Sequence, residues 1–149
     1  MPTYHFYQPI EVRYGDLDAQ WHVNHAHIVS YIEHARLMYI QHLGLFDGAS
    51  FLDLKIIVAD LHVAYLAPIH PNAKVRVGVR VARIGNKSLT LEYEVEDENH
   101  GQVCARGETV MVAFDYRSQK SVPVSAEWRK TISEFEGIPS GLPEGVARG

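Results

Sequence analysis

The sequence predicts an α+β fold in which a curved five-stranded antiparallel sheet wraps around a long central helix. Two observations support this prediction. Residues 25–42 have apolar side chains at helical spacing and further apolar side chains almost all round, so the helix should be enclosed. Residues 53–116 have strand patterning broken by short turns. A single antiparallel sheet covers an enclosed helix most simply by curving around it.

The long helix has clear start and stop signals. Asn24 is a good N-cap, because its side chain can accept a hydrogen bond from a free N–H of the first turn. Gly44 follows the last apolar residue and suits a helix end. Residues at steps of three or four define the main apolar face: Ile28, Ile32, Ala35, Tyr39 and Leu43.

Five segments have strand character. The first, 6–13, contains Pro9 and therefore suits a sheet edge or an irregular start. The other four are 56–66, 75–82, 89–96 and 103–116. Short turns such as Gly85-Asn86 join the last three into an antiparallel meander. One curved sheet leaves its own edges uncovered, so we expect two copies of the chain to pair through a sheet edge.

The length and composition indicate one globular domain. Of 149 residues, 46% are hydrophobic and 21% are charged. We expect the domain to span residues 1–136, with a weak helix at 128–135 that Ser125 could cap. Residues 137–149 are rich in Gly and Pro and predict a flexible tail.

The charge and the targeting features narrow the partners. The net charge of −4 offers no general attraction to nucleic acid or to an anionic membrane. The single Cys104 leaves no intramolecular disulfide and no multi-cysteine zinc site. The sequence shows neither a signal peptide nor an apolar run long enough for a membrane span. We therefore expect a cytoplasmic protein.

The candidate site is the polar segment YGDLDAQWHVNH at 14–25, called loop 14–25 below. It ends where the long helix begins, beside the unpaired backbone N–H groups and the positive end of the helix dipole. Such a place can hold a developing negative charge, which indicates catalysis. Its acids, histidines and asparagine are Asp16, Asp18, His22, Asn24 and His25.

The pattern of these residues resembles a known signature. It consists of Asp-x-Asp, a short spacer, His-Val-Asn, and a helix with Tyr, Glu and Arg on one side. The matching residues are Asp16, Asp18, His22, Val23, Asn24, Tyr31, Glu33 and Arg36. Weaker matches occur at 62–77 and 84–88. The chain resembles the hotdog-fold acyl-CoA thioesterases of the 4-hydroxybenzoyl-CoA thioesterase branch over residues 8 to 124.

This resemblance implies that the protein hydrolyses an acyl-CoA thioester to the free acid and coenzyme A. It assigns Asp18 as the catalytic carboxylate, which either deprotonates water or attacks the thioester itself, and the sequence leaves both routes open. It assigns the backbone N–H of His25 to the thioester carbonyl. It implies no metal or cofactor apart from the coenzyme A of the substrate. It also implies a homodimer or a homotetramer with the active site at the subunit interface.

Two positions depart from the family pattern. Trp21 stands where relatives usually have Gly, so we expect its side chain to wall or narrow the acyl pocket. His25 stands where many relatives have Asn or Tyr, but a backbone donor survives any side chain except proline.

Other residues have both a structural and a functional interpretation. Asp16 is expected to be structural, His22 a loop residue or a substrate contact, and Asn24 a helix cap or a substrate contact. Tyr31 is a further substrate-binding candidate. Arg83 and Lys87, which flank the Gly85-Asn86 turn, are candidates for the phosphates of coenzyme A or are ordinary solvated charges.

The helix adds two further hypotheses. Glu33 is either a second acid or base, or an ion-pair partner of Arg36. The histidine-rich run could suggest a metal, but His25 and His27 would point about 200° apart on a helix and cannot face one ion.

Rival functions also remain. One is an acyl-carrier-protein thioesterase, although an acidic carrier would favour a more basic surface. Another is a dehydratase or hydratase of the same fold, whose characteristic histidine and acid are placed differently from the Asp18 pattern. The third is a non-catalytic acyl-CoA-binding protein.

Overall fold

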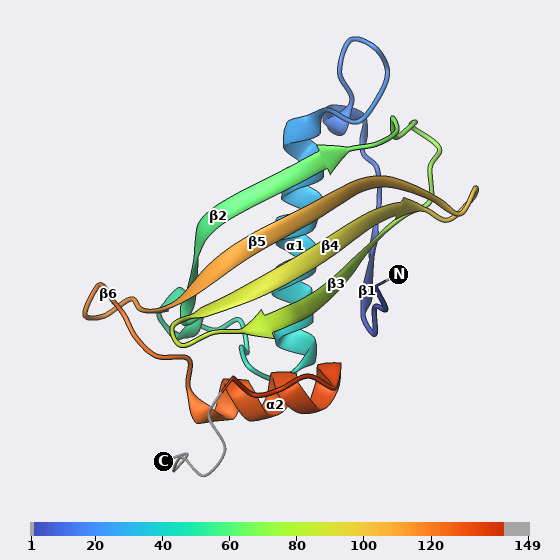
Figure 1. Cartoon of the computed structure of the whole chain (residues 1–149). Helices are drawn as coiled ribbons and strands as arrows, with labels where there is room; N and C mark the ends of the chain where they lie inside the picture. Colours follow the sequence, from blue (N-terminus) through green and yellow to red (C-terminus); the bar gives the residue numbers. More distant parts are fainter. Residues whose placement is uncertain (1, 142–149) are drawn as a thin grey trace. The chain divides into compact units, whose positions relative to one another are not determined.

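The structure is a computed structural model that describes residues 2–141. Its elements follow the chain in the order shown in Figure 1. They are β1 (Tyr7–Ile10), α1 (His25–His42), β2 (Ile56–Tyr65), β3 (Val75–Ile84), β4 (Ser88–Asp97), β5 (Gln102–Asp115), β6 (Lys120–Ser121) and α2 (Ala126–Glu136), with short 3-10 turns at Tyr14–Asp16 and Phe51–Asp53.

The strands form one sheet in the order β1-β3-β4-β5-β2, and β6 pairs with β5. Strand β1 runs antiparallel to β3, with Tyr7 opposite Gly78 and Ile10 opposite Val75. The five predicted strands and the predicted meander are therefore confirmed. Strand β2 ends the order, so one of its edges has no partner strand among residues 2–141.

The described chain divides into two compact units, and α1 and each of β2 to β5 contribute one part to each unit. The first unit holds residues up to Tyr39, His62–Arg80 and Glu92–Glu108. The second holds Ile40–Leu61, Val81–Leu91 and the residues from Thr109 on.

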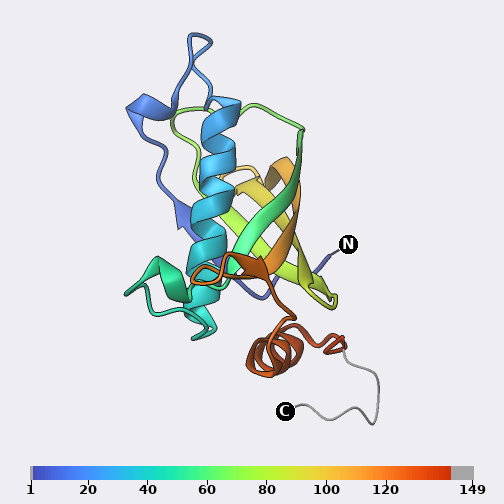
Figure 2. The ribbon, with the colours of Figure 1, turned by 90° about the vertical axis from the view of Figure 1, so that its left-hand side faces the viewer.

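In the first unit, α1 packs closely against the strands (Figure 2). Ile32 and Ala35 are fully buried, and so are Val77 and Val79 on β3. A Cβ atom added at Gly107 on β5 would lie 3.1 Å from Cδ1 of Ile32. The alternation of apolar residues on the strands thus supplies the face that receives the apolar side of the helix.

In the second unit, the apolar side of α2 is buried, and Trp128 lines one cavity together with Leu89 of β4. Trp128 and Ile132 are buried, as are Leu89, Leu91 and Met111. The helix begins after Ser125, whose Oγ accepts a hydrogen bond from the Trp128 N–H (3.3 Å), as expected for an N-cap. It ends at Gly137, which has a φ of 69°. The helix is longer than the predicted 128–135 because Ser125 starts it one residue downstream, at Ala126.

The helix bounds of α1 agree with the sequence prediction, whereas the first strand is shorter than predicted. The strand ends at Ile10 and a 3-10 turn follows at Tyr14–Asp16. The Arg13 N–H donates to Asp16 Oδ2 (3.1 Å), so the backbone turns here instead of extending the ladder. Strand β6 was not predicted, because two residues carry no periodicity.

The tail predicted at 137–149 lies mostly outside the described residues, and its flexibility stays a prediction. Among residues 2–141, no helix is both long and apolar enough to cross a membrane.

Candidate active site

Loop 14–25 folds back on itself as a closed turn. Leu17 and Val23 form an isolated antiparallel bridge. At the tip, the Trp21 N–H donates to the Asp18 carbonyl (3.0 Å) and the Asp18 N–H donates to the His22 carbonyl (2.9 Å). The Val23 N–H donates to the carbonyl of Ile69 (2.9 Å), which ties the loop to the segment between β2 and β3. The loop is therefore held by backbone bonds and is not a loose connection.

Asp16 anchors this loop to helix α1. Its side chain is buried, and its Oδ2 accepts a hydrogen bond from the Tyr31 hydroxyl at 2.6 Å. His27 Nδ1 lies 3.3 Å from Oδ1, and the Asn24 N–H donates to the Asp16 carbonyl at 2.8 Å. His27 and Tyr31 stand one helical turn apart, so both reach the same carboxylate. This arrangement supports the structural interpretation of Asp16.

The environment of Asp16 keeps the carboxyl ionised. Burial raises its pKa, but the hydrogen bonds from Tyr31 and from the Arg13 N–H, together with the nearby charges of Arg13 and His27, outweigh burial and lower the pKa below its ordinary value. Burial and the bond to Asp16 raise the pKa of the Tyr31 hydroxyl. Tyr31 therefore remains a hydrogen-bond donor at neutral pH.

Asp18 is held differently, with one oxygen engaged and the other available. Its Oδ1 accepts hydrogen bonds from the N–H groups of Gln20 (2.9 Å) and His22 (3.3 Å). Its Oδ2 has no hydrogen-bond partner among residues 2–141. The side chain is half-buried. The turn thus fixes the orientation of the carboxylate and leaves one oxygen for a water molecule or a substrate atom.

The start of α1 presents one unpaired donor. Asn24 caps the helix, since its Oδ1 accepts from the Ala26 N–H (2.9 Å) and its carbonyl accepts from the His27 N–H (2.9 Å). The predicted cap is confirmed. Within the described part of the chain, the His25 N–H has no acceptor. It is an orphan donor at the positive end of the helix, where an oxyanion would be stabilised.

Asp18 and His25 line one open groove of about 350 Å³ within the first unit. The lining residues are Asp18, His22, Val23, His25, Ile28, Tyr65, Leu66, Ala67, Pro68 and Ile69. We call this the loop groove. A carboxylate with a free oxygen, an orphan N–H and an apolar floor are the parts needed to add water to a polarised carbonyl.

Two ring contacts shape the loop groove. Tyr65 at the end of β2 donates its hydroxyl to the His25 carbonyl (3.3 Å), and its ring meets the His25 ring edge-on at 6.0 Å. The rings of His22 and His70 also meet edge-on, with centroids 5.0 Å apart. Sequence reasoning missed His70, because it lies far along the chain from the motif and has no spacing that ties it to His22.

The backbone of Trp21 has a conformation that favours glycine, the residue that the resembled family usually has at this position. Its φ is 65°, in the left-handed region that favours glycine. Its side chain is 55% exposed and its ring lies edge-on to Tyr14, with centroids 6.1 Å apart. Trp21 is not among the residues that line the loop groove. Its role in acyl selection stays a prediction.

The other candidates are placed as follows. Tyr31 is buried against Asp16 and does not line the loop groove, so its substrate contact stays a prediction. Glu33 is exposed and forms no ion pair with Arg36 among the described residues. Arg36 donates instead to the Tyr93 hydroxyl at 3.5 Å, because the two side chains meet where the helix crosses β4. The ion-pair interpretation of Glu33 is therefore wrong, and its role as a second acid or base stays a prediction.

Two histidines of α1 contact separate partners: His27 contacts Asp16 and His25 contacts Tyr65. Residues 2–141 contain no group of three His, Cys, Asp or Glu side chains that could hold a metal ion.

The β3–β4 turn in the second unit is hydrogen-bonded to a buried arginine, Arg129. Arg129 on α2 donates to the carbonyls of Gly85 (2.8 Å), Asn86 (2.7 Å), Val124 (3.0 Å) and Ser140 (2.9 Å). Arg83 and Lys87 flank this turn and are exposed, and neither forms an ion pair with a described residue. Their role toward phosphates stays a prediction.

The fold is an α+β architecture of the hotdog type. The model of the thioesterase-like superfamily matches residues 12–132, so the chain belongs to this superfamily. The family resemblance seen in the motif is confirmed.

Similar proteins agree with this assignment. A thioesterase from Thermus thermophilus, solved with coenzyme A and Zn, is 32% identical, with a TM-score of 0.80 over 93% of this chain and 100% of that one. The long-chain acyl-CoA thioesterase FadM of Escherichia coli (strain K12) is 24% identical over 126 residues, covering 85% of this chain and 96% of FadM. The uncharacterized protein YsmA of Bacillus subtilis (strain 168) is 27% identical over 130 residues, 87% of this chain and 86% of YsmA.

Proposed function

We propose that this thioesterase hydrolyses acyl-CoA thioesters, with Asp18 as the catalytic carboxylate and the His25 N–H as the oxyanion donor. One observation carries the proposal: a carboxylate with an unengaged oxygen and a helix start with an orphan N–H belong to the same groove. The names of FadM and of the Thermus thermophilus complex support coenzyme A as the carrier of the acyl group.

In the hydrolytic route, Asp18 Oδ2 accepts a proton from water while the water oxygen attacks the thioester carbon. The carbonyl oxygen gains negative charge and is stabilised by the His25 N–H and the helix dipole. Collapse of this intermediate breaks the C–S bond, and the thiolate of coenzyme A recovers a proton from Asp18. Loss of a single oxyanion donor typically raises the activation free energy by about 3–4 kcal/mol.

The alternative route uses the same atom as a nucleophile. Asp18 Oδ2 attacks the thioester carbon, coenzyme A leaves, and water then hydrolyses the mixed anhydride. The two hydrogen bonds on Oδ1 fit either route, because they orient the carboxylate without occupying Oδ2. Trapping of an acyl–Asp18 adduct during turnover would establish the covalent route. In a single turnover in ¹⁸O-labelled water with excess enzyme, ¹⁸O in Asp18 would establish it as well, with water attacking the aspartyl carbonyl of the anhydride.

We further propose a homodimer that pairs through the free edge of β2. Ile57, Val58 and Leu61 on this strand are each about 40% exposed, which is unusual for large apolar side chains of a strand. A second copy would cover them and would place the active site at the interface. A solution mass of 16.8 kDa, that of one chain, would contradict this proposal.

A thioester panel tests the proposed function and separates its rivals. The purified protein is offered acyl-CoAs of short, long and aromatic acyl groups and the same groups on acyl-carrier protein, and thiol release is followed. We expect release from acyl-CoA. Release from carrier thioesters alone would favour the carrier-protein rival. Tight acyl-CoA binding without release from any thioester would favour the non-catalytic binding protein.

Arg83 and Lys87 are proposed to contact the phosphates of coenzyme A. If so, Lys87→Gln raises the KM for acyl-CoA but not for the matching acyl-pantetheine, which lacks the nucleotide phosphates. Equal effects on both substrates would count against this role.

A further inference from the structure

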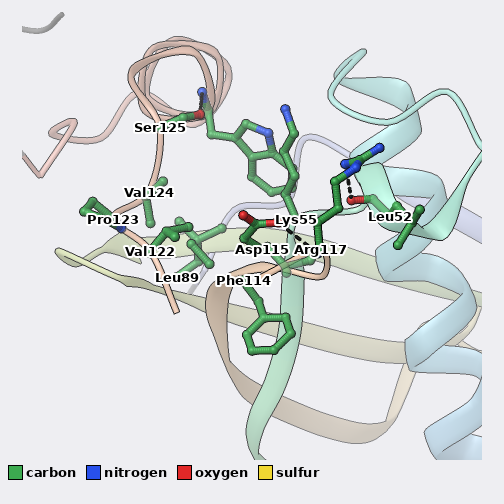
Figure 3. A pocket seen from close by; sticks show the side chains of 13 residues that line it. Leu52, Lys55, Leu89, Phe114, Asp115, Arg117, Val122, Pro123, Val124 and Ser125 are labelled. Atoms are coloured by element: carbon green, nitrogen blue, oxygen red, sulfur yellow. Dashed lines mark hydrogen bonds between the residues drawn. The ribbon is translucent and has the colours of Figure 1, made fainter. Parts of the chain in front are cut away.

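A second cavity, of about 280 Å³, lies within the second unit between the end of β5 and the start of α2 (Figure 3). It shares no residue with the loop groove. Its lining residues are Leu52, Lys55, Ile56, Leu89, Ala113, Phe114, Asp115, Arg117, Val122, Pro123, Val124, Ser125 and Trp128. We call it the β5–α2 cavity.

The walls of the β5–α2 cavity are apolar and fixed. Nine of its thirteen lining residues carry hydrocarbon or aromatic side chains, among them the buried Leu89 and Trp128. Backbone bonds hold the walls together, from Val122 N–H to the Ala113 carbonyl (2.9 Å) and from Phe114 N–H to the Lys55 carbonyl (2.9 Å). The volume is slightly below the usual range for sites of drug-sized ligands, so it suits a smaller molecule.

Three charged side chains line the cavity, and two of them have partners. Asp115 accepts hydrogen bonds from the Arg117 N–H at Oδ1 (2.9 Å) and from the Ser118 hydroxyl at Oδ2 (3.0 Å). Arg117 pairs with Asp53 at 3.2 Å. It also donates a hydrogen bond to the Leu52 carbonyl (3.5 Å), which is drawn in Figure 3. Arg117 and Asp53 thus compensate each other's charge, whereas both oxygens of Asp115 accept hydrogen bonds but pair with no cation among residues 2–141.

Lys55 is the exception. Its ammonium group has no partner among residues 2–141. Its φ of 68° lies in the left-handed region, which is unfavourable for a lysine. Lys55 is exposed at the rim, and it is the one charged side chain of the lining that has neither a hydrogen bond nor an ion pair in the described chain. Beside the apolar walls, its ammonium group can pair with the charged end of an apolar anion.

We propose that the β5–α2 cavity binds an apolar monocarboxylate, whose carboxylate pairs with Lys55 and whose hydrocarbon body lies against Leu89 and Trp128. The acid released by thioester hydrolysis belongs to this chemical class, so the product of the reaction is a candidate occupant. The proposal does not depend on the hydrolytic activity, because the binding test below involves no thioester.

Tryptophan fluorescence reads out this cavity directly. The chain has two tryptophans, so Trp21→Phe leaves Trp128 in the cavity wall as the single emitter. This variant is titrated with hexanoate and with 1-hexanol, which share the same hydrocarbon chain and differ in charge. We expect hexanoate to change the Trp128 emission saturably and to bind more tightly than 1-hexanol.

A lysine variant then tests the charge. In the same background, Lys55→Gln should weaken hexanoate binding about fivefold, the upper range for an exposed ion pair, and leave 1-hexanol unchanged. Lys130→Gln, on the exposed side of α2, serves as the control and should change neither. Val122→Phe, which fills the cavity from its half-exposed wall, should abolish both signals.

Three results would overturn the proposal. The first is an emission of Trp128 that hexanoate leaves unchanged at every concentration. The second is equal affinity for hexanoate and 1-hexanol in the lysine-containing protein. The third is hexanoate binding that survives Val122→Phe in a variant whose circular dichroism shows a folded chain, since the ligand would then bind elsewhere.

Discussion

Replacing Tyr31 with phenylalanine removes one oxygen from the contact that anchors loop 14–25 to α1. The Tyr31 hydroxyl lies 2.6 Å from Asp16 Oδ2, and the two residues are only 4% and 3% exposed. A hydrogen bond to a charged acceptor contributes about 1.5–3 kcal/mol, and water cannot replace the lost donor at this depth. We therefore expect Tyr31→Phe to lower the free energy of unfolding by about 2 kcal/mol.

Urea denaturation at neutral pH measures this loss, and thermal unfolding should show a decrease in Tm of roughly 4–8 °C for a chain of this size. Tyr14→Phe is the matched control. It makes the same chemical change at the start of loop 14–25, but Tyr14 is 83% exposed, so the unfolding free energy of this variant should stay within about 0.5 kcal/mol of the parent. Equal stabilities of the two variants would refute the anchoring role of Asp16 and Tyr31.

The pH dependence gives an independent check. The folded-state pKa of Asp16 is lowered, so its ionised form stabilises the fold above the unfolded-state pKa of about 3.9. That contribution is lost as the pH falls through the folded-state pKa. The difference between the parent and Tyr31→Phe should therefore be constant near neutral pH and shrink below about pH 4. A difference that grows on acidification would contradict this linkage.

Two further substitutions test the loop tip and the β3–β4 turn. Because residue 21 has a φ of 65°, the Trp21→Gly variant should be more stable than the Trp21→Ala variant by about 1 kcal/mol in urea denaturation. A change of acyl preference of either variant in the thioester panel would support contact between Trp21 and the acyl group. Arg129→Met removes the donors of four carbonyls and should lower the unfolding free energy by about 3 kcal/mol, whereas the exposed Lys130→Met should change it little. A Trp21→Gly variant that is less stable than Trp21→Ala would contradict the first expectation. Equal losses of unfolding free energy in Arg129→Met and Lys130→Met would contradict the second.

Much of the fold is readable in the sequence because its signals are local. Asn24 and Gly44 bracket α1, and the alternation of Val75 to Val81 identifies β3 without knowledge of its neighbours. Strand β6 escapes such an analysis, since its two residues are strands only through pairing with β5.

The candidate site is only partly readable in the same way. The positions of Asp18 and the helix start follow from the motif and its spacing. The partners of Asp16 do not, because they depend on how loop 14–25 folds back on the helix. One signal was available, since His27 and Tyr31 stand four residues apart on one helix face and thus could share an acceptor. The conformation of Trp21 could not be foreseen from a residue that rarely adopts positive φ.

The central claim is that the carboxylate of Asp18 performs the chemistry, and one comparison tests it most directly. The value of kcat/KM is measured for the best acyl-CoA of the panel with Asp18→Asn and with Glu33→Gln, the exposed acid of α1 that is the other candidate. Asp18→Asn keeps an acceptor oxygen for the N–H groups of Gln20 and His22 but cannot take up a proton, so we expect a loss of about 10²–10⁴-fold. Glu33→Gln should stay within about twofold of the parent, because Glu33 does not line the loop groove. Full activity of Asp18→Asn together with loss in Glu33→Gln would contradict the assignment and move the catalytic carboxylate to the helix.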